Sequence, residues 1–300
     1  MAFDFQRRVK RIFGEDALDW FHKSYILDWQ VPIRSILLVA WFIIRYIKNF
    51  MHVTERSFSA DDPLISHPHR KNQVSSAFNQ FIAFIVPSAL VFCVGCLKKS
   101  LMDIHHGIVG LLATRSLATL VIDFLKNRVG RLRPDFLARC KWNEALQACA
   151  GKPQDIIDGR KSFPSGHSAT AWSGMFYASL FIAGQTAAWC FQTRSSPGIL
   201  SSRLVRLVLT LAPMTWALHV ALSRMEDYRH HKEDVIIGSI IGVLSAWIGY
   251  HIFWPNPCSV STFKFESASQ PRSLYVELDE NNSERVEFEL APVDEGTNAV

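Results

Sequence analysis

Long apolar blocks without a charged residue are the feature that most constrains what this chain can fold into. No Asp, Glu, Lys or Arg occurs from Phe78 to Leu97, from Ser168 to Thr193, or from Val235 to Pro255. These blocks are too long for ordinary β-strands, and they lack the polar face that a helix of a soluble protein repeats at helical period. A helix needs about 20 apolar residues to cross a bilayer, so each block predicts a membrane-spanning helix.

Three further segments complete this prediction, namely Ile104–Leu125, Leu204–Leu222 and, with the weakest signal, Val31–Phe50. The first contains Asp123 and, in its middle, Arg115; a mid-span charge is costly, so Arg115 either pairs with a carboxylate of another helix or lines a site. In the last segment Arg34 and Arg45 flank the charge-free core and must extend to the membrane surfaces. We therefore expect an all-α fold, a bundle of six transmembrane helices within residues 31–254.

The two ends of the chain differ from this central domain. Residues 1–30 are charged, and Phe5, Val9, Ile12 and Phe13 recur there near helical spacing beside basic residues. This segment is either an amphipathic helix on an anionic membrane surface or a solvated leader. Residues 255–300 carry 9 acidic and 3 basic side chains without a long apolar run, which predicts a disordered acidic tail.

The predicted topology brings three connecting segments together. Six crossings place the segments 51–77, 126–167 and 223–234 on one side of the membrane and both termini on the other. Basic residues usually concentrate on the cytosolic side. The segment 126–167 carries nine of them: Lys126, Arg128, Arg131, Arg133, Arg139, Lys141, Lys152, Arg160 and Lys161. Either this segment is cytosolic or its function overrides the rule, and the charge count leaves both open.

Polar motifs gather in these same-side segments. Pro164, Ser165, Gly166 and His167 stand where the predicted fourth span begins. A helix N-terminus presents free N–H groups and the positive end of the helix dipole, and a glycine lets the backbone approach a ligand closely, so this pattern suits a phosphate group. The alternative interpretation is a plain helix N-cap.

The segment before the sixth span combines histidines with a carboxylate. His230 and Asp234 are four residues apart, so a helix would bring them to one face. A carboxylate bonded to one ring nitrogen fixes the tautomer and leaves the other nitrogen free as a nucleophile. His231 fits this role as well, and a basic anchor for lipid headgroups is the alternative. Three cations that match phosphate geometry accompany these groups: Lys126, Arg133 and Arg224.

Together the motifs resemble those of the type 2 phosphatidic acid phosphatase superfamily. They are Lys126 with six residues to Arg133-Pro134, then Pro164-Ser165-Gly166-His167, then Ser223-Arg224 with five residues to His230 and three more to Asp234. Their order and spacing match without departure. The sequence from Gly130 to Phe136 and the His230-His231 pair resemble the lipid phosphate phosphatase branch. Within that branch, they are most similar to fungal and plant enzymes that act on phosphatidate and diacylglycerol pyrophosphate.

The resemblance implies hydrolysis of a lipid phosphate through a phosphohistidine, without a metal or other cofactor. His230 would attack phosphorus, Asp234 would orient it, and His167 would protonate the leaving alkoxide and then activate water. The phosphate oxygens would be held by Lys126, Arg133, Ser165, Gly166 and Arg224. The implied partner is a phospholipid substrate in the bilayer and not a nucleic acid, and a homo-oligomer stays open.

The resemblance also implies an active site at the lumenal or extracellular membrane face and cytosolic termini. The protein would reside in an endomembrane (endoplasmic reticulum, Golgi or vacuole) or in the plasma membrane. In such an oxidising compartment Cys140 and Cys149, nine residues apart, are candidates for a disulfide.

Three functions stay open on the sequence. The first is a phosphatase for phosphatidate-like glycerolipids. The second is a sphingoid-base phosphate phosphatase or a headgroup transferase of the same superfamily; the motif spacing and the Pro134-Asp135-Phe136 run favour the first. The third is an anion or phospholipid transporter, which predicts broken helices in internal repeats that this sequence does not display.

Overall fold

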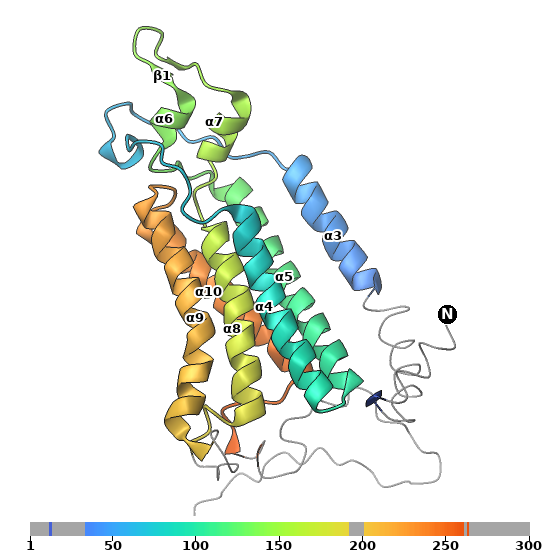
Figure 1. Cartoon of the computed structure of the whole chain (residues 1–300). Coiled ribbons are helices and arrows are strands. Elements are labelled where there is room, and N and C mark those ends of the chain that lie inside the picture. Colours follow the sequence, from blue (N-terminus) through green and yellow to red (C-terminus); the bar gives the residue numbers. More distant parts are fainter. Residues whose placement is uncertain (1–11, 14–33, 192–200, 261–262, 264–300) are drawn as a thin grey trace, which may run out of the picture.

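A computed structural model describes residues 12–13, 34–191, 201–260 and 263 (Figure 1). Six long helices dominate it: α3 (Arg34–Asn49), α4 (Ser76–Leu97), α5 (Leu101–Val129), α8 (Gly166–Thr186), α9 (Arg203–Glu226) and α10 (Lys232–Phe253). Each overlaps one predicted apolar segment, and the all-α prediction is confirmed. The predicted segment 1–30 and the tail 255–300 lie almost wholly outside the described residues.

The ends of the long helices follow from local sequence signals. Serine caps begin four of them, because the side chains of Ser75, Ser100, Ser165 and Ser202 each accept a hydrogen bond from a backbone N–H three residues on. Gly130 ends α5 with φ of +60° and lies so close to the carbonyl of Thr54 that a Cβ would come within 1.9 Å of the oxygen. Only glycine fits this turn, which directs the chain from α5 toward Arg133.

Helix α8 forms the centre of the bundle. It packs against α4, α5, α9 and α10, and Figure 1 shows it between α9 and α4. Close approach depends on small residues, since a Cβ on Gly174 would lie 2.1 Å from the carbonyl oxygen of Ala83 in α4, and one on Gly242 would lie 2.6 Å from that of Ala169 in α8. A hydrophobic core cluster that includes Tyr177 fills the interior of the bundle. The Tyr177 hydroxyl donates a hydrogen bond to the carbonyl of Gly107 at 2.8 Å.

Four of the helices, α4, α5, α9 and α10, are long and apolar enough to cross a membrane. The apolar part of α3, Leu38–Ile47, is shorter. Helix α8 has 21 residues but is rich in small and polar ones, most of which are buried by its neighbours. The predicted fourth apolar block runs to Thr193, whereas α8 ends at Thr186 because Ala187 turns into the left-handed region with φ of 53°.

The predicted same-side segments lie together at one end of the bundle. Their backbones are linked directly: Thr54 N–H donates to the carbonyl of Asn127 at 2.9 Å, and His67 N–H to that of Pro134 at 2.9 Å. Short elements fold within them: η2 (Pro63–Ile65), α6 (Phe136–Cys140), β1 (Trp142–Asn143), β2 (Ala148–Cys149) and α7 (Pro153–Gly159). The antiparallel pair β1–β2 is closed by a disulfide between Cys140 and Cys149, which confirms that pairing.

Candidate active site

A cavity of about 420 Å³ opens at this end of the bundle, between α4, α5 and α8 and the segments above them. All three motifs contribute to its walls. Six of the predicted site residues line it: Lys126, Arg133, Gly166, His167, Arg224 and His230. Six cationic side chains and two carboxylates line it altogether, so the cavity is strongly positive and suits an anion with several oxygens.

The start of α8 is docked on the start of α10. Ser165 N–H donates to the carbonyl of Asp234 at 2.8 Å, and a Cβ on Gly238 would lie only 2.4 Å from the Ser165 carbonyl oxygen. Ser165 itself serves as the N-cap of α8, and Gly166 is the residue that reaches the cavity. A Cβ on Gly166 would lie 3.1 Å from Lys126 Nζ, so the glycine leaves room for this cation at the helix N-terminus.

His230 is held with one ring nitrogen satisfied. Its Nδ1 lies 2.7 Å from the carbonyl oxygen of Ser162, which can only accept, so Nδ1 carries the proton and the lone pair is on Nε2. Asp234 Oδ2 lies 3.9 Å from Nδ1 of His230. The same oxygen accepts a hydrogen bond from the Ser162 hydroxyl at 2.5 Å, and Oδ1 accepts one from Arg131 Nη1 at 2.7 Å. Burial lowers the pKa of His230 from 6.5 to about 4, against the opposing effect of Asp234, so the imidazole is neutral at physiological pH.

His231 has a different place. It is the N-cap residue of α10, and its Nδ1 lies 3.3 Å from Asp234 Oδ2 in a capping box. Its Nε2 lies 3.2 Å from the carbonyl oxygen of Leu64. Of these two neighbouring histidines, His230 is the one that lines the cavity within the described part of the chain. The structure thus separates two residues that helical spacing alone does not distinguish.

His167 enters the cavity from the first turn of α8. Its backbone carbonyl accepts a hydrogen bond from Asn79 Nδ2 at 3.0 Å, which ties α8 to α4 at this level. Its Nε2 is buried and has no hydrogen-bond partner among the described residues. An unsatisfied ring nitrogen on a cavity wall is available to exchange a proton with a bound ligand.

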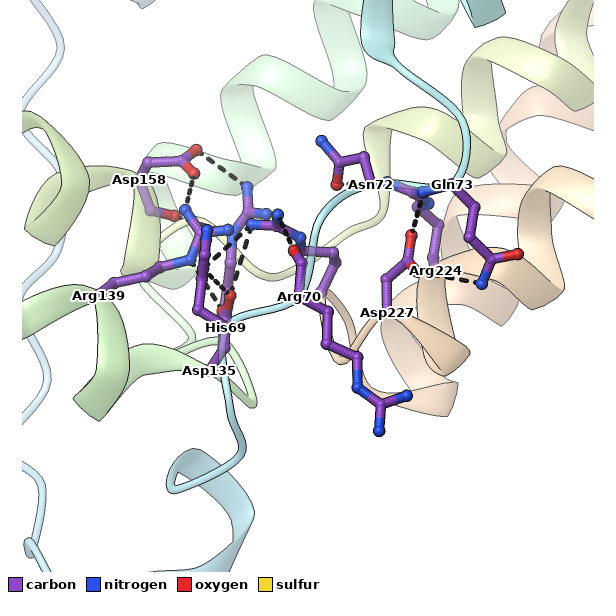
Figure 2. Close-up of polar contacts among 11 residues, drawn as sticks. His69, Arg70, Asn72, Gln73, Asp135, Arg139, Asp158, Arg224 and Asp227 are labelled. Carbon is purple, nitrogen blue, oxygen red and sulfur yellow. Dashed lines mark hydrogen bonds and ion pairs between the residues drawn. The ribbon is translucent and has the colours of Figure 1, made fainter.

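The motif arginines are fixed by carboxylates. Arg133 donates from Nε to the carbonyl and from Nη2 to the carboxylate of Asp158, both at 2.9 Å, and burial lowers its pKa to about 10 although Asp158 opposes this shift. Arg224 donates from Nη2 to Asp227 at 2.7 Å and from Nη1 to Asn72 at 3.2 Å. Figure 2 shows Asp158 and the Arg224–Asp227 pair on either side of the segment that leads into α4.

Several polar lining residues lie outside the predicted set, among them Asn79, Arg115, Arg139 and Arg229. Arg139 and Arg229 converge on the buried Asp135, with nitrogen to oxygen distances of 2.8 and 3.5 Å. His69 bonds the same carboxylate at 2.7 Å, and Figure 2 shows His69 and Arg139 beside Asp135. Arg229 could have been identified as a site residue because it is adjacent to His230. Arg115 could have been identified by its charge inside a predicted span. The sequence carries no comparable signal for Asn79.

Comparisons with known proteins agree with this geometry. The model of the PAP2 superfamily matches residues 107–258. The chain is 31% identical to a probable diacylglycerol pyrophosphate phosphatase 1 of Schizosaccharomyces pombe, over 78% of this chain and 85% of the relative. It is 29% identical to lipid phosphate phosphatase 1 of Arabidopsis thaliana, over 85% of this chain and 76% of the relative. It is 30% identical to diacylglycerol pyrophosphate phosphatase 1 of Saccharomyces cerevisiae, over 73% and 78%.

No solved structure matches the chain significantly. The family match nevertheless spans α8, α9 and α10 and most of α5, and so includes all three motifs that form the cavity. Sequence similarity and the convergence of the motifs therefore lead to the same conclusion: the chain belongs to the PAP2 superfamily.

Proposed function

We propose that this protein is an integral-membrane lipid phosphate phosphatase that hydrolyses phosphate monoesters and pyrophosphates of glycerolipids, such as phosphatidate, lysophosphatidate and diacylglycerol pyrophosphate. The observation that carries the proposal is the meeting of His230, His167 and the motif cations around one positive cavity. The relatives named as lipid phosphate and diacylglycerol pyrophosphate phosphatases support the substrate class.

The first step is a phosphoryl transfer to His230. Its Nε2 lone pair attacks phosphorus, the bond from phosphorus to the leaving oxygen breaks, and His167 donates its proton to that oxygen. The product alcohol leaves and a phosphohistidine remains. Asp234 stabilises the positive charge that develops on the imidazole, because its carboxylate lies 3.9 Å from Nδ1 behind the ring.

The second step returns His230 to its starting state. His167, now neutral, takes a proton from a water molecule that attacks the phosphohistidine, the bond between phosphorus and Nε2 breaks, and inorganic phosphate is released. Lys126, Arg133, Arg224 and the N-terminus of α8 at Ser165-Gly166 neutralise the equatorial oxygens in both steps. With that many cations the charge is compensated by the chain itself, so we propose a mechanism independent of metal ions.

The membrane arrangement is part of the proposal. We infer that all six long helices cross the bilayer within a phosphatase domain of residues 31–254, α8 at the centre of the bundle and α3 at its side, and that residues 1–30 and 255–300 are cytosolic. The disulfide Cys140–Cys149 supports a lumenal or extracellular catalytic end, because disulfides persist in oxidising compartments. The endomembranes and the plasma membrane both satisfy this condition.

A substrate panel tests the function. Purified protein in detergent micelles with EDTA is offered phosphatidate, diacylglycerol pyrophosphate, lysophosphatidate and a sphingoid-base phosphate, and phosphate release is measured. We expect release from the glycerolipids in EDTA, its loss in His230→Ala, and substantial turnover in His231→Ala. A strict requirement for Mg²⁺, or an active His230→Ala beside an inactive His231→Ala, would overturn the proposed mechanism.

A labelling experiment tests the orientation. Sealed microsomes are treated with a membrane-impermeant maleimide in a variant that keeps only Cys140 and Cys149 of the six cysteines. We expect labelling only after both reduction and permeabilisation. Labelling of unreduced, intact microsomes would place the catalytic end in the cytosol.

A further inference from the structure

The cavity continues from the phosphate site into the interior of the bundle, where Arg115 lines it. Arg115 precedes Lys126 by 11 residues on α5, so the two lie about 16 Å apart along the helix axis and share a face with the intervening lining residues Thr119 and Ile122. Arg115 Nη1 donates to the carbonyl of Thr170 at 3.0 Å and to Ser173 Oγ at 3.1 Å. The guanidinium therefore lies below His167, along the wall that α8 provides.

The charge of Arg115 is not explained by packing. Both acceptors of Nη1 are neutral, and among the described residues Arg115 forms no ion pair, so its remaining donors are available to a ligand in the cavity. The carboxylates on the same helix, Asp123 and Asp103, are eight and twelve residues away, about 12 and about 18 Å along the axis. A cation kept inside a candidate span without a carboxylate is costly and marks a substrate path.

A second polar group, at the level of His167, has an unused acceptor. Asn79 is 1% exposed, lines the cavity, and uses Nδ2 to hold the carbonyl of His167. Its Oδ1 is buried without a hydrogen-bond partner in the described part of the chain. The wall beyond His167 thus offers unused donors from Arg115 and an unused acceptor from Asn79, which is the pattern of a binding site and not of a packed core.

The position of His167 decides which part of a substrate meets this wall. In the proposed mechanism His167 protonates the leaving oxygen, so the carbons attached to that oxygen extend past His167 toward Arg115 and Asn79. In a diacyl glycerolipid that region carries ester carbonyl oxygens, which accept hydrogen bonds from a guanidinium. In a sphingoid base it carries an ammonium group, which a guanidinium repels.

We propose that Arg115 determines substrate specificity by binding the ester carbonyl oxygens of a glycerolipid and by disfavouring sphingoid-base phosphates. The proposal rests on the proposed phosphatase function and deepens it. Asn79 holds the adjoining wall in place and accepts a hydrogen bond from a free hydroxyl of the glycerol where one is present.

The test compares pairs of substrates on one enzyme, so that a loss of folded protein cancels. Diacyl phosphatidate and its dialkyl ether analogue differ only in the ester carbonyls. We expect the wild-type protein to favour the diacyl over the ether lipid by about tenfold in kcat/KM, the factor typical of one charge-assisted hydrogen bond. In Arg115→Gln the ratio should fall to within about twofold of unity, and the ratio of sphingoid-base phosphate to phosphatidate should rise.

Arg206→Gln is the matched control. Arg206 is also a buried arginine in a candidate span, but it donates to the carbonyl of Thr186 at 2.9 Å, at the opposite end of α8 from the cavity. This variant should keep the wild-type ratios. If Arg115→Gln is inactive, Arg115→Lys replaces it and should give an intermediate ratio.

Two outcomes overturn the inference: equal rates on the ester and ether lipids in the wild-type protein, or an unchanged ratio in the Arg115 variant. Failure of the proposed function has a different appearance, because the wild-type protein would then release no phosphate from any lipid in EDTA.

Discussion

The hydrogen bond of His230 Nδ1 goes to the backbone carbonyl of Ser162 at 2.7 Å, while the carboxylate of Asp234 stands 3.9 Å away. Two tasks that a single carboxylate often performs are thus divided. The carbonyl fixes the tautomer, and Asp234 contributes negative charge. Asp234 is kept in place by the Ser162 hydroxyl and by Arg131. A backbone carbonyl survives any side-chain substitution, which makes the division testable.

The first prediction is an order of effects. His230→Ala removes the nucleophile and should abolish phosphate release. Asp234→Asn keeps the tautomer but loses a charge near the ring, worth up to about 4 kcal/mol at this distance, so kcat should fall by roughly 10²–10³-fold. Ser162→Ala keeps the carbonyl and removes only the hydroxyl, and its kcat should fall by less than about tenfold. Steady-state kinetics on phosphatidate measures all three, and a Ser162→Ala variant as impaired as Asp234→Asn would contradict the division.

The second prediction concerns pH. The pKa of His230 is about 4 in the folded protein, chiefly through burial, and about 6.5 in an unfolded chain. Between these values the unfolded state binds a proton that the folded state does not, so acidification from pH 6.5 to 4 should destabilise the protein by about 3 kcal/mol, with no further change below pH 4. His230→Gln lacks this contribution. The difference in unfolding midpoint between the two proteins in detergent, followed from pH 7 to 4, measures it; a constant difference would show that His230 titrates normally.

The third prediction separates two adjacent carboxylates. Asp227 is buried and pairs with Arg224, and it also accepts hydrogen bonds from Gln73 N–H at 2.9 Å and Gln73 Nε2 at 3.0 Å (Figure 2). Asp227→Asn leaves the buried guanidinium without its counter-charge, which should cost about 3 kcal/mol of stability.

Arg224 is also a proposed phosphate ligand, and Asp227 holds its guanidinium in place. Because Asp227→Asn weakens this hold, inhibition by inorganic phosphate should weaken by about tenfold. Glu226→Gln is the control, since Glu226 is exposed and bonds only the Gln73 amide at 2.9 Å and, through its backbone carbonyl, Arg70 at 3.3 Å among the described contacts. It should change stability by less than about 0.5 kcal/mol and phosphate inhibition not at all. Equal effects of the two substitutions would remove Asp227 from the site.

Much of this arrangement could be predicted from the sequence, for identifiable reasons. The long helices follow from blocks without charges, because membrane helices must be apolar where they meet lipid. The motif residues Lys126, Arg133, His167 and His230 meet in one cavity as their spacing and the predicted topology require. The disulfide partners were predicted through the compartment implied by the family resemblance.

Other parts depend on contacts between distant segments and leave no local pattern. The carbonyl of Ser162 and the side chain of Asn79 acquire their roles only when α8, α10 and α4 pack together. The short elements α6 and α7 and the β1–β2 hairpin interrupt a polar segment without periodicity. Helix α8 could be predicted only in part. Because neighbouring helices surround it, it can carry small and polar residues, and these weaken the hydropathy signal of a membrane span.

The last prediction concerns the contact between α8 and α10. A methyl group on Gly238 would stand 2.4 Å from the carbonyl oxygen of Ser165, a backbone atom that cannot move aside alone. Gly→Ala in a helix usually stabilises by about 1 kcal/mol. Here the clash should reverse the sign and destabilise by about 1–3 kcal/mol.

Since α10 carries Asp234 and α8 carries His167, the same shift should misalign the two halves of the site, and kcat should fall further than stability alone explains. Ile240→Ala is the control, because Ile240 is 47% exposed on the outer face of α10 and does not touch this contact. Thermal unfolding and phosphatidate turnover of both variants are measured side by side. A Gly238→Ala protein that is more stable than wild type and fully active would show that α8 and α10 do not need this close approach to form the site.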